Sequence, residues 1–330
     1  MKASQNPIFR FQLMITLIGI GLFALKITAW YFTQSVAVLT DALESTVNIS
    51  SALLGLYSIY LSAKPKDEDH PYGHGKIEFL TSAIEGALVF VAGLLIILEA
   101  IKNLRNPHEP KELGLGIIII AFTGLINFIM GWFAVKNGRK SNSLALVSGG
   151  KHLQSDTYST MGIVLGLILM QITGLYWLDS IIALIFAFII LFTGYKIIRE
   201  SIAGIMDEAD EALIEKLVNY LEENRAPEII DLHNLRMIKY GRMIHLDCHI
   251  TVPWYFDVTQ AHSQIDKLDQ MVAAHFGNSV ELFVHVDACI ESSCKLCTIA
   301  DCPVRKHDFV QKVKWTHANI RSNKKHEIGN

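Results

Sequence analysis

A histidine and an aspartate four residues apart inside a long apolar stretch are the residues best suited to chemistry in this sequence. His152 and Asp156 lie within residues 144–173, and positions i and i+4 share one face of an α-helix. An ionisable side chain in a membrane span costs about 2.5–3.5 kcal/mol, so it usually marks an ion path or a relay. Because an imidazole and a carboxylate supply two ligands for a divalent cation, we interpret this pair as half of a metal site.

A second polar group lies in the apolar stretch at residues 36–61. Offsets of 0, 3, 4 and 7 put its members on one helix face: Asp41, Glu44, Ser45 and Asn48. In a membrane span such a stripe faces protein or water rather than lipid. Ser45 and Asn48 are also typical of structural contacts between spans. Asp41 argues for a cation site, since a buried carboxylate needs a cation.

Two other groups could bind metal outside the apolar stretches. The first is the run KPKDEDHPYGHGK, whose candidate ligands are Asp67, Glu68, Asp69, His70 and His74; a solvated charged loop would look the same. The second is scattered over the C-terminal part: His233, His245, His249, His262, His285 and Asp287. Histidines at strand ends are often only surface residues. However, His285 and Asp287 alternate along a predicted strand, which points both to one face and favours a metal site.

Four of the five cysteines fall within fourteen residues, as Cys289, Cys294, Cys297 and Cys302. Disulfides are not expected in a cytoplasmic segment, and a C-x2-C core with flanking cysteines is typical of a tetrahedral structural zinc site. His307 could replace Cys289 as the fourth ligand. Reduced, unliganded thiols and an iron–sulfur cluster are the alternatives, although nothing else in the sequence indicates redox chemistry.

The elements that must position these residues are membrane spans. Hydrophobic residues make up 51% of the 330-residue chain, and six stretches reach the ~20 residues that a span needs: 11–32, 36–61, 79–104, 113–135, 144–173 and 178–198. Lys and Arg concentrate on the side that would hold both termini, which predicts that both termini are cytoplasmic and the protein multi-pass in the cell's inner (plasma) membrane. We expect Lys26, deep in the first span, to snorkel toward the outer interface; packing or a salt bridge is the alternative.

The chain after residue 205 has a different composition and predicts a small soluble domain. Helical spacing at 210–224 and 258–276, and alternation at 232–238, 243–252 and 280–286, give the order α-β-β-α-β, with the helices on one sheet face. We therefore predict three regions: a transmembrane domain at 1–205, a cytoplasmic α+β domain at 206–288, and a cysteine-bearing segment at 289–330. The basic residues from 306 onward are expected to form a mobile tail.

Together these features resemble the cation diffusion facilitator family of divalent-metal/proton antiporters, in its bacterial iron/zinc efflux form. The resemblance covers about residues 10–288 and rests on HPYGHGK at 70–76, the His152/Asp156 pair within KHLQSD, and six spans followed by an α-β-β-α-β domain. It implies a homodimer joined partly through the cytoplasmic domains. It also implies a pair between Lys76 and Asp207.

The resemblance also implies the ligands of three metal sites. The transport site would take Asp41, His152 and Asp156; the family's fourth ligand is acidic, but here that position is Ser45, so Asn48, Glu44 or water would complete the shell. The loop site would take His70 and His74 with either Asp67 or Glu68. The cytoplasmic binuclear site would take five residues: His233, His249, His262, His285 and Asp287. His245 has no family counterpart.

These implications predict a transporter rather than an enzyme. It would export a divalent cation (Zn²⁺, Fe²⁺, Co²⁺, Mn²⁺ or Cd²⁺) in exchange for protons by alternating access, with Zn²⁺ in structural or regulatory sites and no nucleic-acid partner. An intramembrane metal hydrolase would need a motif such as H-E-x-x-H, which the sequence lacks. A membrane-anchored divalent-metal sensor is the remaining alternative, but it would not account for Asp41, His152 and Asp156 in the bilayer.

Overall fold

The computed structural model describes residues 7–62, 64–105, 111–140, 144–240, 243–277 and 280–328, except the side chains of residues 7–12, 55, 56, 59, 138–140, 144–149 and 152. The chain divides into two compact units. Residues 1–59 and 80–202 form one, which we call the helical unit, and residues 60–79 and 203–330 form the other, the C-terminal unit.

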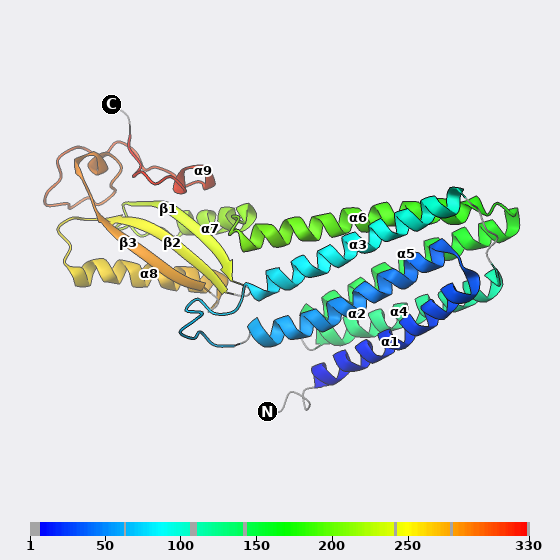
Figure 1. Cartoon of the computed structure of the whole chain (residues 1–330). Coiled ribbons are helices and arrows are strands. Elements are labelled where there is room, and N and C mark those ends of the chain that lie inside the picture. The colour runs from blue at the N-terminus through cyan, green and yellow to red at the C-terminus, as the bar shows by residue number, and fades with distance from the viewer. Residues whose placement is uncertain are drawn as a thin grey trace. The chain divides into compact units, whose positions relative to one another are not determined.

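Six long helices lie where the sequence predicts membrane spans (Figure 1). They are α1 (Pro7–Thr33), α2 (Val36–Ser62), α3 (Ile77–Arg105), α4 (Leu113–Lys140), α5 (Leu144–Thr173) and α6 (Trp177–Ile205). Among the described residues, four segments are long and apolar enough to cross a membrane, at 13–33, 77–105, 113–137 and 177–205. The helices outside this group are α2 and α5, which carry the polar residues of the candidate transport site.

Glycines allow two pairs of helices to approach closely. A Cβ atom on Gly150 of α5 would lie 2.7 Å from the carbonyl oxygen of Gly131 in α4, and a Cβ on Gly131 would lie 2.7 Å from the carbonyl oxygen of Gly150. Between α3 and α6, a Cβ on Gly194 would lie 2.8 Å from the backbone nitrogen of Phe90. Small residues at such crossings let helix backbones pack directly, as is common in membranes.

The start of α2 is fixed by a carboxylate from another helix. Asp179, at the start of α6, is fully buried and accepts hydrogen bonds from Ser35 Oγ (2.5 Å), Val36 N (2.7 Å) and Ala37 N (3.2 Å). The first N–H groups of a helix have no partner within the helix and carry partial positive charge. Asp179 therefore stabilises α2 at its first turn and fixes the helix that carries Asp41.

The C-terminal unit has the predicted α-β-β-α-β order. Its elements are α7 (Glu211–Glu223), β1 (Asp231–Tyr240), β2 (Met243–Val252), α8 (Val258–Phe276) and β3 (Val280–Ala288). The strands lie in the order β1-β2-β3, with β1 antiparallel and β3 parallel to β2. Asp210 caps α7 through Leu213 N, and Asp257 forms a capping box with Gln260 at α8.

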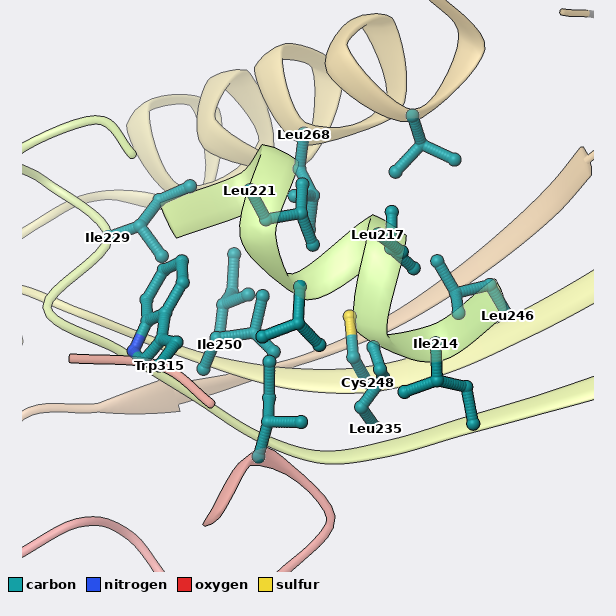
Figure 2. Close-up of a cluster of buried hydrophobic side chains, with 14 of the residues drawn as sticks. Ile214, Leu217, Leu221, Ile229, Leu235, Leu246, Cys248, Ile250, Leu268 and Trp315 are labelled. Atoms are coloured by element: carbon teal, nitrogen blue, oxygen red, sulfur yellow. The ribbon is translucent and has the colours of Figure 1, made fainter. Parts of the chain in front are cut away.

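One hydrophobic core lies between the two helices and one face of the sheet. Leu246, Cys248 and Ile250 of β2 point toward α7 in Figure 2 and are almost fully buried. Because side chains alternate along a strand, His245 and His249 lie on the opposite face of the sheet. That second face carries the polar residues of the candidate cytoplasmic site.

Residues after 306 pack on this core, so the predicted mobile tail is wrong. Trp315 lies beside Ile229 in Figure 2 and is 1% exposed, and Ile320 in the short helix α9 (His317–Ile320) is fully buried. The Arg225 guanidinium lies 4.1 Å from the centre of the Trp315 ring, and its Nη1 donates to Val313 O at 3.0 Å. These apolar anchors and the arginine order a segment whose basic composition indicated mobility.

Residues 64–76, between α2 and α3, lie against the sheet of the same unit. The Tyr72 ring contacts the rings of Tyr240 and His245, with centroid distances of 5.8 and 5.4 Å. Lys76 Nζ lies 2.9 Å from Asp207 Oδ2, which confirms the predicted pair. His245 is 3% exposed, and burial lowers its pKa, with Glu281 opposing the shift. His245 therefore holds this segment in place, in keeping with its lack of a family counterpart.

Candidate metal sites

Asp41 on α2 is buried among partners from two other helices. Its Oδ2 lies 2.8 Å from Nζ of Lys26 on α1, and its Oδ1 accepts a hydrogen bond of 2.9 Å from Thr160 Oγ1 on α5. Lys26 is 2% exposed, so the expectation that it snorkels to the interface is wrong and its salt-bridge alternative holds. A buried carboxylate attracts the ammonium more strongly than the interface does.

Asp156 on α5 lies across from the same face of α2. It is 6% exposed, and its Oδ2 accepts a 2.7 Å hydrogen bond from Asn48 Nδ2. Ser45 Oγ is 3.1 Å from the backbone oxygen of Asp41, an i−4 bond within α2. Glu44 is partly buried and interacts electrostatically with Asp156, Asp41 and Lys26. The predicted polar stripe of α2 therefore meets α5, with Glu44 as a second acidic side chain.

His152 belongs to α5 one turn before Asp156, but its side chain lies outside the described residues. Its predicted role as a ligand therefore rests on its helical spacing and on the family resemblance. Asp41 and Asp156 place carboxylate oxygens on facing helices, and such oxygens suit hard and borderline divalent cations.

The loop group brings three predicted ligands together. His70 Nδ1 lies 3.0 Å from Asp67 Oδ1, and His74 Nε2 lies 3.4 Å from Asp67 Oδ2. The two imidazole rings are 4.3 Å apart between centroids. The potential ligand atoms of Asp67, His70 and His74 all lie within 4.8 Å of one another. Glu68 is exposed and does not belong to this group. Of the two predicted acidic alternatives, the geometry favours Asp67.

Three histidines form a row across the second face of the sheet, opposite the hydrophobic core. The strand register pairs His233 of β1 with His249 of β2, and His249 with His285 of β3. Asp287, two residues beyond His285, lies 3.4 Å from His233 Nε2 and 3.4 Å from His249 Nδ1. The potential ligand atoms of His233, His249 and Asp287 lie within 4.8 Å of one another. His285 is adjacent, with its Nε2 3.8 Å from Asp287.

A second carboxylate supports this row, and the sequence reasoning missed it. Asp231, 2% exposed, lies 3.3 Å from His233 Nδ1 and 2.6 Å from His326 Nδ1. Burial disfavours its charged form, but the two imidazoles and the His326 N–H outweigh burial and hold the pKa of Asp231 below its usual value. Carboxylates that orient metal-binding histidines in this way are a common support for metal sites. Asp231 and His233 alternate along their strand just as His285 and Asp287 do. This spacing in the sequence could have identified Asp231 as part of the site.

His262, the remaining predicted ligand of this site, lies apart from the row. It is on α8, where its Nε2 is 3.7 Å from Asp266, and it lines a hollow with Trp254 and Val258. Lys325 and His326, which the sequence gave no reason to choose, do reach the site: Lys325 Nζ lies 3.7 Å from Asp287 Oδ1. The C-terminal segment therefore contributes to the surroundings of the histidine row.

The cysteines also converge. Cys289, Cys294, Cys297 and Cys302 all line one small hollow together with Arg305, and all are free thiols. His307 is not among the residues that line it.

Comparison with known proteins agrees with this arrangement. A family model described as the cation efflux transmembrane domain matches residues 13–206, and one described as the cytoplasmic domain of cation efflux proteins matches residues 209–289. An uncharacterized transporter of Synechocystis sp. is 32% identical over 260 residues, which cover 77% of this chain and 82% of its own length. The cation-efflux pump FieF of Salmonella paratyphi A is 26% identical over 286 residues, 85% of this chain and 92% of the pump.

Proposed function

Because the chain belongs to the cation efflux family, we propose that it exports a divalent metal cation, foremost Zn²⁺ or Fe²⁺, from the cytoplasm in exchange for protons. Co²⁺, Mn²⁺ and Cd²⁺ are further candidates, since oxygen-rich sites accept all of them. The membrane is the bacterial inner membrane, with both termini in the cytoplasm. In this view the protein is a transporter rather than an enzyme.

The observation that carries this proposal is the presence of two buried carboxylates on facing membrane helices. Asp41 and Asp156 are 1% and 6% exposed, and polar partners on the opposite helix contact each of them. Such groups are costly in a bilayer and are retained for ion pathways. Together with His152, they form the transport site that we propose, with Glu44, Asn48 or Ser45 completing the shell.

Competition between metal and protons for this site would couple the two fluxes. Carboxylates and imidazole bind a divalent cation when deprotonated and release it when protonated, and an imidazole exchanges protons near neutral pH. Alternating exposure of the site to the two sides of the membrane then moves metal outward and protons inward.

The C-terminal unit would sense cytoplasmic metal. The histidine row with Asp287 and the Asp67/His70/His74 group each gather carboxylate and imidazole ligands, and bound cations would neutralise these clusters. We place the homodimer contact partly in this unit. Phe283 lies on the second face of the sheet, and its side chain is 48% exposed in the single chain. This exposed aromatic ring supports that placement.

Transport by the purified protein in proteoliposomes tests the proposal. A pH-sensitive dye inside the vesicles reports proton movement while Zn²⁺, Fe²⁺, Co²⁺, Mn²⁺ and Cd²⁺ are supplied in turn. We expect metal-dependent proton flux in the wild type, and background flux in Asp41→Ala, His152→Ala and Asp156→Ala. Ser45→Ala is expected to be much milder, because a hydroxyl is a weak ligand.

Glu99→Gln is the matched control, since Glu99 is a carboxylate on α3 that is 40% exposed and pairs with Lys102. Near-normal flux in Asp156→Ala would overturn the site assignment. Wild-type protein that binds these metals without moving metal or protons would support the sensor alternative instead.

A further inference from the structure

Three of the four cysteines of the hollow lie beyond the part of the chain that the family model covers, since the cytoplasmic-domain match ends at residue 289. Its four thiols come from a short stretch that directly follows β3. Cys289 is attached to β2: its N–H donates to Val252 O at 2.8 Å, and its Sγ accepts from the Trp254 N–H at 3.4 Å. One wall of the hollow is therefore the end of the sheet itself.

The other three cysteines follow within residues 294–302, where a partly buried arginine holds the backbone. A 3-10 turn at Glu291–Lys295 carries Cys294, and the N–H of Cys297 donates to Cys294 O. The Arg305 guanidinium donates to the backbone oxygens of Cys294 and Cys297, both at 3.2 Å, and of Ile299 at 2.5 Å. These bonds hold the backbone around the hollow that all four cysteines line.

The electrostatics of the hollow suit a soft divalent cation. Four thiolates so close together would repel one another without a cation. Arg305 contributes one positive charge nearby, which would partly offset the negative charge of a zinc–tetrathiolate centre.

We propose that Cys289, Cys294, Cys297 and Cys302 bind one structural Zn²⁺ per chain, separate from the exported ion. Binding displaces four thiol protons and gives a tetrahedral centre with Zn–S distances of ~2.3 Å, so sulfurs would lie about 3.8 Å apart. In the described chain, no three of these sulfur atoms lie within 4.8 Å of one another, whereas the ligand atoms of the loop group and of the histidine row do. Zinc would therefore draw the 290–302 turn onto the end of β3.

This zinc would also anchor the segment that reaches the histidine row. Residues beyond the cysteines return to the sheet, where Lys325 Nζ donates to Ala288 O at 2.9 Å and His326 contacts Asp231. Ala288 immediately precedes Cys289. The centre would thus fix the start of this connection at Cys302, while the contacts of Lys325 and His326 fix its other end.

Metal analysis of the full-length protein in detergent, after exhaustive dialysis against a weak chelator, tests the proposal. The double variant Cys294→Ser/Cys297→Ser should retain one equivalent of zinc per chain fewer than the wild type. His307→Ala, which lies outside the hollow, and Cys248→Ala, which removes a core cysteine, should retain as much as the wild type. Equal zinc in the wild type and the double variant would overturn the proposal, as would iron with acid-labile sulfide in the wild type.

A second measurement uses only the wild-type protein and does not depend on how the variants fold. Thiol alkylation of the native protein followed by mass spectrometry should leave the four cysteines unmodified, and a strong chelator should make all four reactive. Reactive thiols before chelation would contradict the proposal. Transport is a separate readout, so a protein that holds this zinc but moves no metal would refute only the proposed function.

Discussion

Asp41 has a partner of opposite charge before any metal arrives. Lys26 Nζ lies 2.8 Å from its carboxylate, and both side chains are almost fully buried. Removing one partner of a buried pair typically costs about 3–5 kcal/mol, because the remaining charge is left buried and unpaired. At the proposed transport site, an incoming cation would have to compete with this ammonium for the Asp41 carboxylate.

We therefore predict that Lys26→Met lowers the metal concentration needed for half-maximal transport by about tenfold, equivalent to ~1.4 kcal/mol. The unbranched methionine fills much of the same space without a charge, so Asp41 loses its competitor while the protein becomes less stable. Transport measured over a range of Zn²⁺ concentrations and thermal unfolding in detergent check both effects. Lys26→Arg keeps the charge and should resemble the wild type. If Lys26→Met instead needs a higher metal concentration for half-maximal transport, Lys26 does not compete with the metal for Asp41.

Sequence spacing predicted which residues share a face, but not their partners. The offsets in α2 and α5 correctly placed Asp41 and Asp156 on polar faces. The partner of Lys26 depends on how α1 is rotated against α2, which apolar composition leaves undefined. Asp231 could have been found from its alternation with His233, whereas His326 lies 95 residues away and approaches only through tertiary packing.

Among the elements, α4 and α5 illustrate how a site can depend on residues that never contact it. The Gly131–Gly150 contact sets the distance between these helices, and Gly150 lies two residues before His152. A methyl group there would meet a carbonyl oxygen at 2.7 Å, and such overpacking commonly costs about 1–3 kcal/mol. The helices would have to separate, which would displace the ligands of α5 from those of α2.

Gly150→Ala should accordingly reduce transport at least tenfold although it removes no ligand. Gly19→Ala in α1 is the matched control, because no atom lies within 4 Å of the position its Cβ would take. Proteoliposome flux, normalised to the amount of folded protein recovered, measures the effect. Wild-type flux in Gly150→Ala would mean that the α4–α5 contact does not control the site.

The order of elements in the C-terminal unit was predictable because alternation and helical spacing are local properties. The association of residues 60–79 with that unit was not, since it depends on contacts of Tyr72 and Lys66 with strands more than 160 residues away. The same holds for the C-terminal segment. Its composition is basic, yet Trp315 and Ile320 are buried in the core of the unit.

At the scale of the whole molecule, the proposed metal-sensing residues and the proposed transport site lie in different parts of the chain. The histidine row lies in the C-terminal unit, and the proposed transport site lies in the helical unit. Loss of the row should therefore weaken metal binding and lower transport only partially, because its residues are not on the ion path.

Calorimetry of full-length protein with Zn²⁺ can test this division. The double variant His249→Ala/His285→Ala should bind fewer equivalents than the wild type and retain part of the transport activity. His262→Ala distinguishes the sequence expectation from the geometry: unchanged binding would remove His262 from the ligand set, and an equal loss would restore it. Unchanged stoichiometry in the double variant would mean that the row does not bind zinc.

The Lys26–Asp41 pair also bears on how the membrane voltage acts on the transport cycle. Moving one elementary charge through 100 mV changes the free energy by about 2.3 kcal/mol. A site that returns empty with Asp41 neutralised by a tethered ammonium carries one negative charge fewer through this field. In the proposed exchange, Asp41 would then need no proton on the return step, and the number of protons exchanged per metal ion would fall by one compared with a site in which every carboxylate must be protonated.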